Sequence, residues 1–184
     1  MNERDSARLA LIPVLAERHP AGHIGRTALM KYLYFLQTLR NVPLGYSFSM
    51  YSYGPFDSDV LSDLSTAESL SIVSSDPVTF SGGYGYRISP APGAVAAKRE
   101  AEEFLVSHRD DIEWVVREFG NLNSAELELS STIVFVDREF AEINPPDARA
   151  HLVNLVNGIK PHFGVEQIER SVDSLQEKRI LVSI

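Results

Sequence analysis

Apolar residues recur at helical spacing along most of the chain, beginning close to its first residues. They predict a first helix with Asp5 or Ser6 as its cap, because either side chain can accept a hydrogen bond from a free backbone N–H. Pro13 lies within this stretch and has no N–H, so the helix either kinks there or begins later, with Pro13 in its first turn. The predicted apolar face consists of Ala7, Leu11, Val14 and Leu15.

The densest apolar stretch predicts a second helix over residues 25–37, buried on almost every side. The charge inside its apolar run is Lys31, which has two interpretations. Its stem can lie along apolar surface while the ammonium reaches water. Alternatively, the ammonium pairs with Asp59 or Asp63 and fixes how the next helix packs.

A third helix is predicted from about Ser58 to Leu70, capped by Asp57 or by Ser58 itself. Before it, apolar and polar residues alternate from Gly45 onward, which predicts a short half-buried strand that ends at Tyr-Gly-Pro-Phe, residues 53–56. The residues predicted to be buried on the third helix are Val60, Leu61, Leu64 and Ala67.

Strand patterns follow the third helix in residues 71–80 and 84–88, around a turn at Ser81-Gly82-Gly83. Three helices followed by a hairpin is the element order of a winged helix. Residues 90–93, Pro-Ala-Pro-Gly, then predict a domain boundary.

The second half reads as helices, with one long helix over 95–118 and a second that Ser124 would cap. Pro145-Pro146-Asp147 precedes a third helix ending near 158–161, and a fourth spans about 163–178 before a short strand at 180–182. Leu64–Val73 and Leu175–Val182 both run from an apolar helix into aliphatic residues, a weak pseudo-repeat. We therefore predict a mainly α (α+β) protein with a winged-helix-like module at 1–90 and an acidic helical module at 94–184.

Charge is distributed unevenly over a net of −8 at pH 7. Residues 1–93 hold seven Lys and Arg against eight Asp and Glu, whereas residues 94–184 hold ten against seventeen. The second half would therefore repel nucleic acid. The sequence has no cysteine, no long apolar run and no signal-peptide pattern, which predicts a soluble, cytoplasmic protein without membrane contact.

Catalytic patterns are missing from the sequence. No G-x-S-x-G motif or cysteine could supply a nucleophile, and the five histidines have no metal-binding spacing. Asp57 and Asp59 are explained by the N-terminal dipole of the third helix. We expect no enzyme activity, no cofactor and no metal.

DNA binding is the main alternative, because a winged helix usually places its third helix in the major groove. That predicted helix carries Asp57, Asp59, Asp63 and Glu68 and no Lys or Arg, which is the wrong charge for a phosphate backbone. A DNA-binding dimer that uses Arg26, Arg40 and Arg87 remains an alternative.

Tyrosines fit protein contact better, since tyrosine anchors interfaces with a large, rigid ring and a polar tip. The competing interpretation is that most of them close the core around the hairpin. The tyrosines concerned are Tyr46, Tyr51, Tyr53, Tyr84 and Tyr86.

Two motifs make residues 26–64 resemble the Panacea-domain proteins and the related phage-associated YwgA-like proteins. The first is R-T-x-L-M-K-Y-L-Y at Arg26–Tyr34, and the second is Y-x-Y-G-P-F at Tyr51–Phe56, followed by Leu61-x-x-Leu64. Residues 160–168 resemble the C-terminal part of the YwgA-like proteins more diffusely. The motif positions taken as structural are Arg26, Leu29, Lys31, Leu33, Tyr34, Asp59 and Asp63.

The resemblance implies a protein-interaction module, because Panacea-domain proteins act as antitoxins through direct contact and one branch is an adaptor for a protease. We therefore expect a non-enzymatic antitoxin-like or adaptor protein of a phage or defence locus, with a toxin or protease component as partner and a homodimer also open. The alternative is a dimeric winged-helix transcriptional regulator. The residues expected to bind the partner are Tyr51, Tyr53, Gly54, Pro55, Phe56, Tyr84 and Tyr86.

Overall fold

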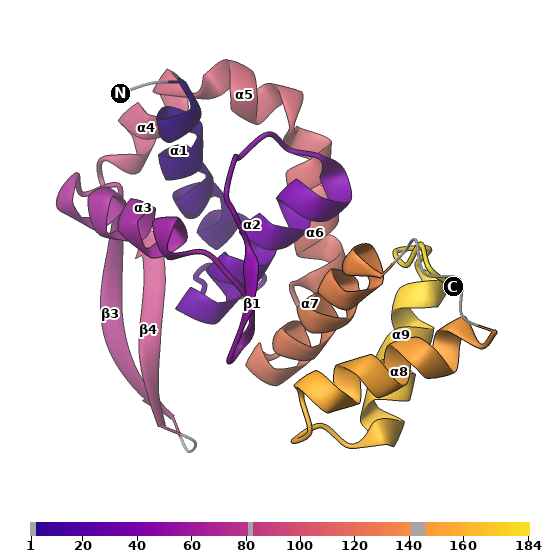
Figure 1. Ribbon diagram of the computed structural model, residues 1–184. Coiled ribbons are helices and arrows are strands. Elements are labelled where there is room, and N and C mark those ends of the chain that lie inside the picture. The colour runs from indigo at the N-terminus through magenta and orange to yellow at the C-terminus, as the bar shows by residue number, and fades with distance from the viewer. Residues whose placement is uncertain (1–2, 81–82, 141–145) are drawn as a thin grey trace. The chain divides into compact units, whose positions relative to one another are not determined.

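The computed structural model describes residues 3–80, 83–140 and 146–184 and is mainly helical, as the sequence predicted (Figure 1). Strands form two antiparallel hairpins among the described residues, β1 with β2 and β3 with β4. The strands are β1 (Ser49–Tyr51), β2 (Gly54–Phe56), β3 (Val73–Phe80) and β4 (Gly83–Pro90). The helices are α1 (Glu3–Arg18), α2 (Arg26–Arg40), α3 (Ser58–Ser69), α4 (Ala94–Glu100), α5 (Glu102–Ser107), α6 (Arg109–Phe119), α7 (Ser124–Glu139), α8 (Ala148–Ile159) and α9 (Val165–Glu177).

The chain divides into two compact units, and neither is continuous in sequence. Unit 1 contains the described residues of 1–48 and 57–122, whereas unit 2 contains those of 49–56 and 123–184. The expected boundary at 90–93 lies inside unit 1, where Ala91 N–H donates to Ile72 O and Gly93 N–H donates to Ser71 O. A Cβ on Gly93 would lie 2.8 Å from Leu70 O. The Pro-Gly signal therefore marks a tightly packed turn against the end of α3.

Helix α1 is one continuous helix that includes Pro13, so the prediction of a later start is wrong. It also begins before Asp5 and Ser6, which lie within the helix and do not cap it. Tertiary packing outweighs the missing proline N–H, because α1 is buried along most of its length. Its largest fully buried side chains are Leu9, Leu11, Ile12 and Leu15.

Helix α2 is the buried helix that the sequence predicted, and Gly25 is its N-cap. Lys31 is only 2% exposed, so the interpretation in which its ammonium reaches water is wrong. Phe35 stacks on Phe119 of α6 with 3.9 Å between ring centroids. Residues after 93 therefore complete the core around α2.

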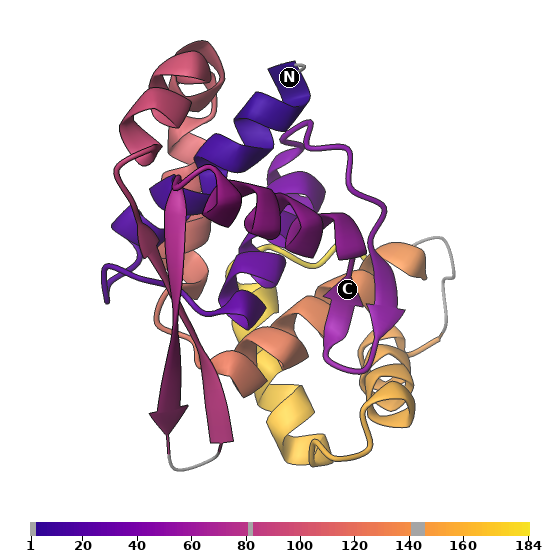
Figure 2. The ribbon, with the colours of Figure 1, turned by 90° about the vertical axis from the view of Figure 1, so that its left-hand side faces the viewer.

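Helix α3 begins at its N-cap Asp57, whose carboxylate accepts from Asp59 N–H, and it buries Val60, Leu64 and Ala67. Leu61 is 38% exposed, contrary to its predicted burial. The hairpin β3–β4 follows as predicted, with Val73 opposite Pro90 and Thr79 opposite Tyr84 (Figure 2). Ser81 and Gly82 of the predicted turn lie outside the described residues. The element order of a three-helix module with a hairpin is confirmed.

The predicted long helix over 95–118 is instead three short helices, α4, α5 and α6. Ala101 and His108 separate them, with ψ of 22° and 17° in place of helical values. All three contact α1, and no glycine or proline marks the bends. Packing around α1 therefore bends a segment whose local sequence favours one straight helix.

In unit 2, α7 begins at a capping box formed by Asn123 and Glu126, not at the predicted cap Ser124. Asp147 caps α8, while Pro145 of the predicted break before it lies outside the described residues. Residues 180–182 are not the predicted strand. The N–H groups of Val182 and Ser183 donate to the buried carboxylate of Asp137, which takes the place of a neighbouring strand.

The two segments of the predicted pseudo-repeat have the same backbone conformation at the C-terminal ends of α3 and α9 and differ beyond them. Ser71 and Arg179 both have left-handed backbones, with φ of 53° and 56°. Ile72 N–H then donates to Ala67 O, and Ile180 N–H donates to Leu175 O, which completes a Schellman motif in each case. The chain after Ile72 enters β3, whereas the chain after Ile180 meets Asp137.

Candidate functional site

The motif Tyr51–Phe56 forms a tight hairpin in unit 2: strand β1 ends at Tyr51, as predicted, but residues 54–56 then form a second strand that was not predicted. Tyr51 of β1 lies opposite Gly54 of β2, so only Ser52 and Tyr53 form the turn. Gly54 has a φ of 85°, a conformation that costs a residue with a Cβ roughly 1–2 kcal/mol. The sequence placed the turn correctly but did not show that Gly-Pro-Phe pairs back onto the residues before it.

Helix α7 lies against Gly54 so closely that a side chain would not fit. A Cβ there would stand 3.0 Å from Ser131 Oγ and 3.2 Å from Thr132 Oγ1. Gly54 and Pro55 are both buried. Two of the residues expected to touch a partner therefore set the path of the hairpin and do not present a surface.

The buried side chain of Lys160 donates hydrogen bonds to the turn between β1 and β2. Lys160 Nζ donates to the carbonyl oxygens of Tyr51, at 3.2 Å, and Ser52. The same ammonium lies 2.9 Å from Glu128 Oε1, and the two side chains are 3% and 9% exposed. Glu128 Oε1 has no well-directed hydrogen bond, so this contact is an ion pair whose donors point at the hairpin carbonyls. His162 Nε2 stands 3.4 Å from the same oxygen and is itself largely exposed.

Burying both charges is expensive, and such a pair fixes a conformation more effectively than it stabilises one. Here it fixes the backbone of Tyr51 and Ser52 through their carbonyl groups. Sequence reasoning noted residues 160–163 only as a loose family match, and it gave no sign of Glu128. The signal that could have indicated it is an otherwise apolar helix, α7, with the acids Glu128 and Asp137 on its buried face.

The side chains of Tyr51 and Tyr53, whose hairpin Lys160 holds, are 64% and 73% exposed. The Tyr51 ring packs on Phe56, with 5.5 Å between the centroids, and Phe56 is half-buried. Two large aromatic side chains thus stand in solvent on a backbone with little freedom. That arrangement lowers the entropy lost when such side chains bind a partner.

Tyr84 and Tyr86 lie on β4, which belongs to unit 1. Tyr84 is 78% exposed, as a contact residue should be. Tyr86 is half-buried beneath Arg26, whose guanidinium carbon lies 3.7 Å from the centroid of its ring. Arg26, a motif residue, therefore stacks on the hairpin.

Tyr46, by contrast, belongs to the core of unit 1 at 5% exposure. Its hydroxyl donates to Asp63 at 2.8 Å, and the Arg8 guanidinium lies 3.9 Å from its ring centroid and 3.7 Å from the Asp63 carboxylate. Burial raises the pKa of the Asp63 carboxyl despite the opposing effects of Tyr46 and Arg8. It also raises the pKa of the Tyr46 hydroxyl, and Asp63 adds to that effect.

The solvent face of α3 is consequently less acidic than the sequence suggested. Asp63 turns inward, and Glu68 is half-buried, which leaves Asp59 as the exposed acid of the helix. The other exposed residues of α3 are Ser58, Leu61, Ser62, Ser65, Thr66 and Ser69. This face is mainly neutral and rich in hydroxyl groups, and it carries no cation.

Two of the three arginines considered for DNA contact are already engaged. Arg26 stacks on Tyr86, and Arg40 Nε donates to Asp111 at 2.8 Å. Arg87 is exposed on β4 and lies opposite Asp76 of β3. Arg87 is therefore an exposed cation on the hairpin, across the ladder from an acidic residue.

Within 3–80, 83–140 and 146–184, no group of three or more histidine and acidic side chains is placed to hold a metal ion. Over the same residues, none of the helices combines the length and apolar character needed to cross a bilayer. The chain matches no model of a known protein family, and it matches no curated protein.

Proposed function

We propose that this protein is a non-enzymatic interaction module of the antitoxin or adaptor type, which binds another protein through the hairpin β1–β2. One observation carries the proposal: Tyr51 and Tyr53 are exposed on a turn whose backbone is held by the buried Lys160–Glu128 pair. Exposed tyrosines on a fixed backbone are what interface anchors require. The resemblance of residues 26–64 to Panacea-domain and YwgA-like proteins supports the same class.

The net charge of −8 favours a basic partner, because complementary charge speeds encounter and discourages wrong partners. In unit 2 the exposed acids include Glu166 and Glu177 on α9. A toxin or protease component with a cationic face would suit this surface. The partner-facing residues proposed are Tyr51 and Tyr53, with Tyr84 as a separate contact on unit 1.

A photo-crosslinking amino acid placed at Tyr53 in the native host tests the proposal. We expect a covalent adduct with one protein, which mass spectrometry identifies. Binding of that purified protein should weaken at least tenfold in Tyr53→Ala and in Tyr51→Ala. Val165→Ala truncates an exposed apolar side chain elsewhere in unit 2 and should bind normally. No adduct, or equal binding by all three variants, would overturn the proposal.

The product of the adjacent gene distinguishes the antitoxin role from the adaptor role. Co-expression of this chain should restore growth if that product is toxic, and Tyr53→Ala should not restore it. Faster degradation of the partner in the presence of the chain would instead indicate an adaptor. If the chain binds the partner but neither restores growth nor speeds degradation of the partner, the binding proposal stands and both the antitoxin role and the adaptor role are excluded.

A winged-helix DNA-binding regulator is the second candidate, because α3 turns Asp63 inward and β4 exposes Arg87. This arrangement removes part of the repulsion expected between α3 and phosphate. A salt-dependent mobility shift with the DNA upstream of its own gene would favour the regulator. Arg87→Gln should then reduce the mobility shift. If the wild type does not bind this DNA even at low salt, the regulator is excluded.

A further inference from the structure

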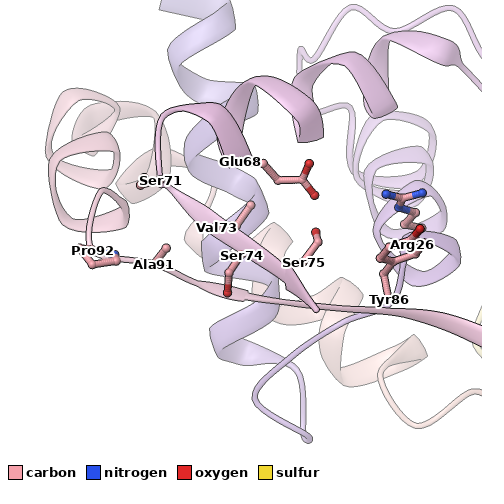
Figure 3. A pocket seen from close by; sticks show the side chains of 9 residues that line it. All are labelled: Arg26, Glu68, Ser71, Val73, Ser74, Ser75, Tyr86, Ala91 and Pro92. Carbon is pink, nitrogen blue, oxygen red and sulfur yellow. The ribbon is translucent and has the colours of Figure 1, made fainter. Parts of the chain in front are cut away.

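Unit 1 contains a pocket of about 470 Å³ between α3, the hairpin β3–β4 and the start of α2 (Figure 3). Its walls come from three stretches of sequence: Arg26, residues 68–75 and residues 86–92. The polar side chains that face it include Arg26, Glu68, Ser75 and Tyr86. The volume lies in the range of pockets that hold small molecules.

Two polar atoms of this pocket lack a hydrogen-bond partner among the residues that the structure describes. They are Glu68 Oε1 and Ser75 Oγ, and both atoms are buried. In Figure 3 the Glu68 carboxylate points from α3 toward Ser75 and toward the side of the pocket where Arg26 lies. Buried polar atoms in native proteins nearly always have a partner, so these two indicate a missing donor.

A cation stands on the opposite side of the same pocket. The Arg26 guanidinium is held over the Tyr86 ring at 3.7 Å, which fixes its position without using its N–H groups. No ion pair joins Arg26 to a carboxylate within the part of the chain described by the structure. The pocket therefore presents a carboxylate and a guanidinium that do not neutralise each other directly.

We propose that this pocket binds a small zwitterion of the α-amino-acid type. The ligand's ammonium donates to Glu68 and Ser75, and its carboxylate accepts from Arg26. A simple anion would be repelled by Glu68 and a simple cation by Arg26, whereas a ligand with both charges satisfies each group. This site belongs to unit 1 and does not depend on the proposed role of the hairpin β1–β2 in unit 2.

Isothermal titration calorimetry of the full chain against each of the twenty amino acids tests the proposal. We expect saturable binding of one amino acid or a few related ones. The amine and the carboxylic acid that correspond to the best ligand, each lacking one charge, should bind at least tenfold more weakly. Binding of none of the twenty, or equal binding of the amine or the acid, would overturn the proposal.

Matched variants locate the site. Glu68→Gln and Arg26→Gln each remove one charged hydrogen bond, which weakens affinity by roughly tenfold to a hundredfold. Asp59→Asn on the same helix and Arg87→Gln on the neighbouring strand remove the same charges outside the pocket and should bind as the wild type. Circular dichroism checks that each variant is folded. If Arg26→Gln unfolds, Glu68→Gln alone tests the site, because glutamine has nearly the same shape as glutamate. Normal binding by Glu68→Gln would overturn the proposal.

Discussion

Two buried cations in this protein, Arg8 and Lys160, donate to backbone carbonyl groups outside the helices. Arg8 donates to the carbonyl oxygens of Leu44 and Gly45, which precede β1. Lys160 does the same for the turn between β1 and β2. Each cation donates to two consecutive backbone carbonyl groups next to or within a turn, so a buried charge helps to hold the backbone there.

Lys160→Met should destabilise the protein by about 3–5 kcal/mol, because Glu128 would remain buried without its partner charge. Urea unfolding followed by circular dichroism measures the loss. The double variant Lys160→Met with Glu128→Leu should recover much of it. Arg170→Met breaks an exposed pair with Glu166 and should change stability by less than about 1 kcal/mol. A loss no larger in Lys160→Met than in Arg170→Met would contradict the account.

Asp63 should make stability depend on pH with a defined sign. Burial raises its pKa above the ordinary 3.8, so the folded state favours the protonated carboxyl. The stability that this contributes is fully present below the ordinary pKa and is lost as pH rises through the folded pKa.

Urea unfolding of the wild type and Asp63→Asn between pH 4 and pH 7 tests this. The stability of the wild type relative to the variant should fall as pH rises, because asparagine carries no such charge. Asp59→Asn on the exposed face of the same helix serves as the control for general charge effects. A parallel pH dependence in Asp63→Asn and wild type would refute the assignment.

At the scale of the element, hydrophobic spacing predicted α2, α3, α8 and α9 well, because each pairs an apolar face with a local cap or break. It failed at α4–α6, where the bends at Ala101 and His108 arise from packing on α1. It also failed at residues 180–182, where the Asp137 carboxylate binds the backbone N–H groups. In both cases the deciding partner is remote in sequence.

Asn123→Ala should destabilise the protein by about 1 kcal/mol, because Asn123 accepts from the N–H groups of Ala125 and Glu126 at the start of α7. Ser124→Ala should change stability by much less, since Ser124 is exposed within the first turn and makes no cap. Thermal unfolding of the two variants decides which residue is the cap. The reverse ranking would restore the sequence prediction.

Gly54→Ala should destabilise unit 2 by at least about 1–2 kcal/mol, from its left-handed backbone alone. The added methyl group also meets Ser131 Oγ at 3.0 Å. Gly164→Ala, at a glycine with ordinary φ and open surroundings, is the matched control. Chemical denaturation measures both, and equal stability of the two variants would show that the hairpin tolerates a side chain.

At the scale of the whole molecule, the two units share one chain that crosses between them more than once. Residues 49–56 leave unit 1, pair and pack with α7 in unit 2, and return at Asp57. The two sequence motifs thus lie in different units, Arg26–Tyr34 in unit 1 and Tyr51–Phe56 in unit 2. A mutation in the second motif therefore acts first on unit 2.

A fragment of residues 1–122 should unfold cooperatively, whereas a fragment of residues 1–93 should not. The shorter fragment lacks α6, and with it Phe119, which stacks on Phe35 in the core. Thermal melts by circular dichroism and dispersion of amide resonances compare the two. Cooperative unfolding of 1–93 would show that the expected boundary is correct after all.

The sequence by itself determined the helical class, the buried character of α2, the position of α3 and the hairpin β3–β4, because these depend on the spacing and type of residues near one another. Only the tertiary structure decided that Tyr-Gly-Pro-Phe turns back as β2, that Asp63 faces Arg8, and that Lys160 lies beneath Tyr51 and Ser52. Arg8 and Lys160 lie tens of residues from the groups that they contact, and β2, although it pairs with the adjacent β1, packs against α7. The energy of burying a charge or a backbone group is set by what surrounds it in space, which local periodicity does not record.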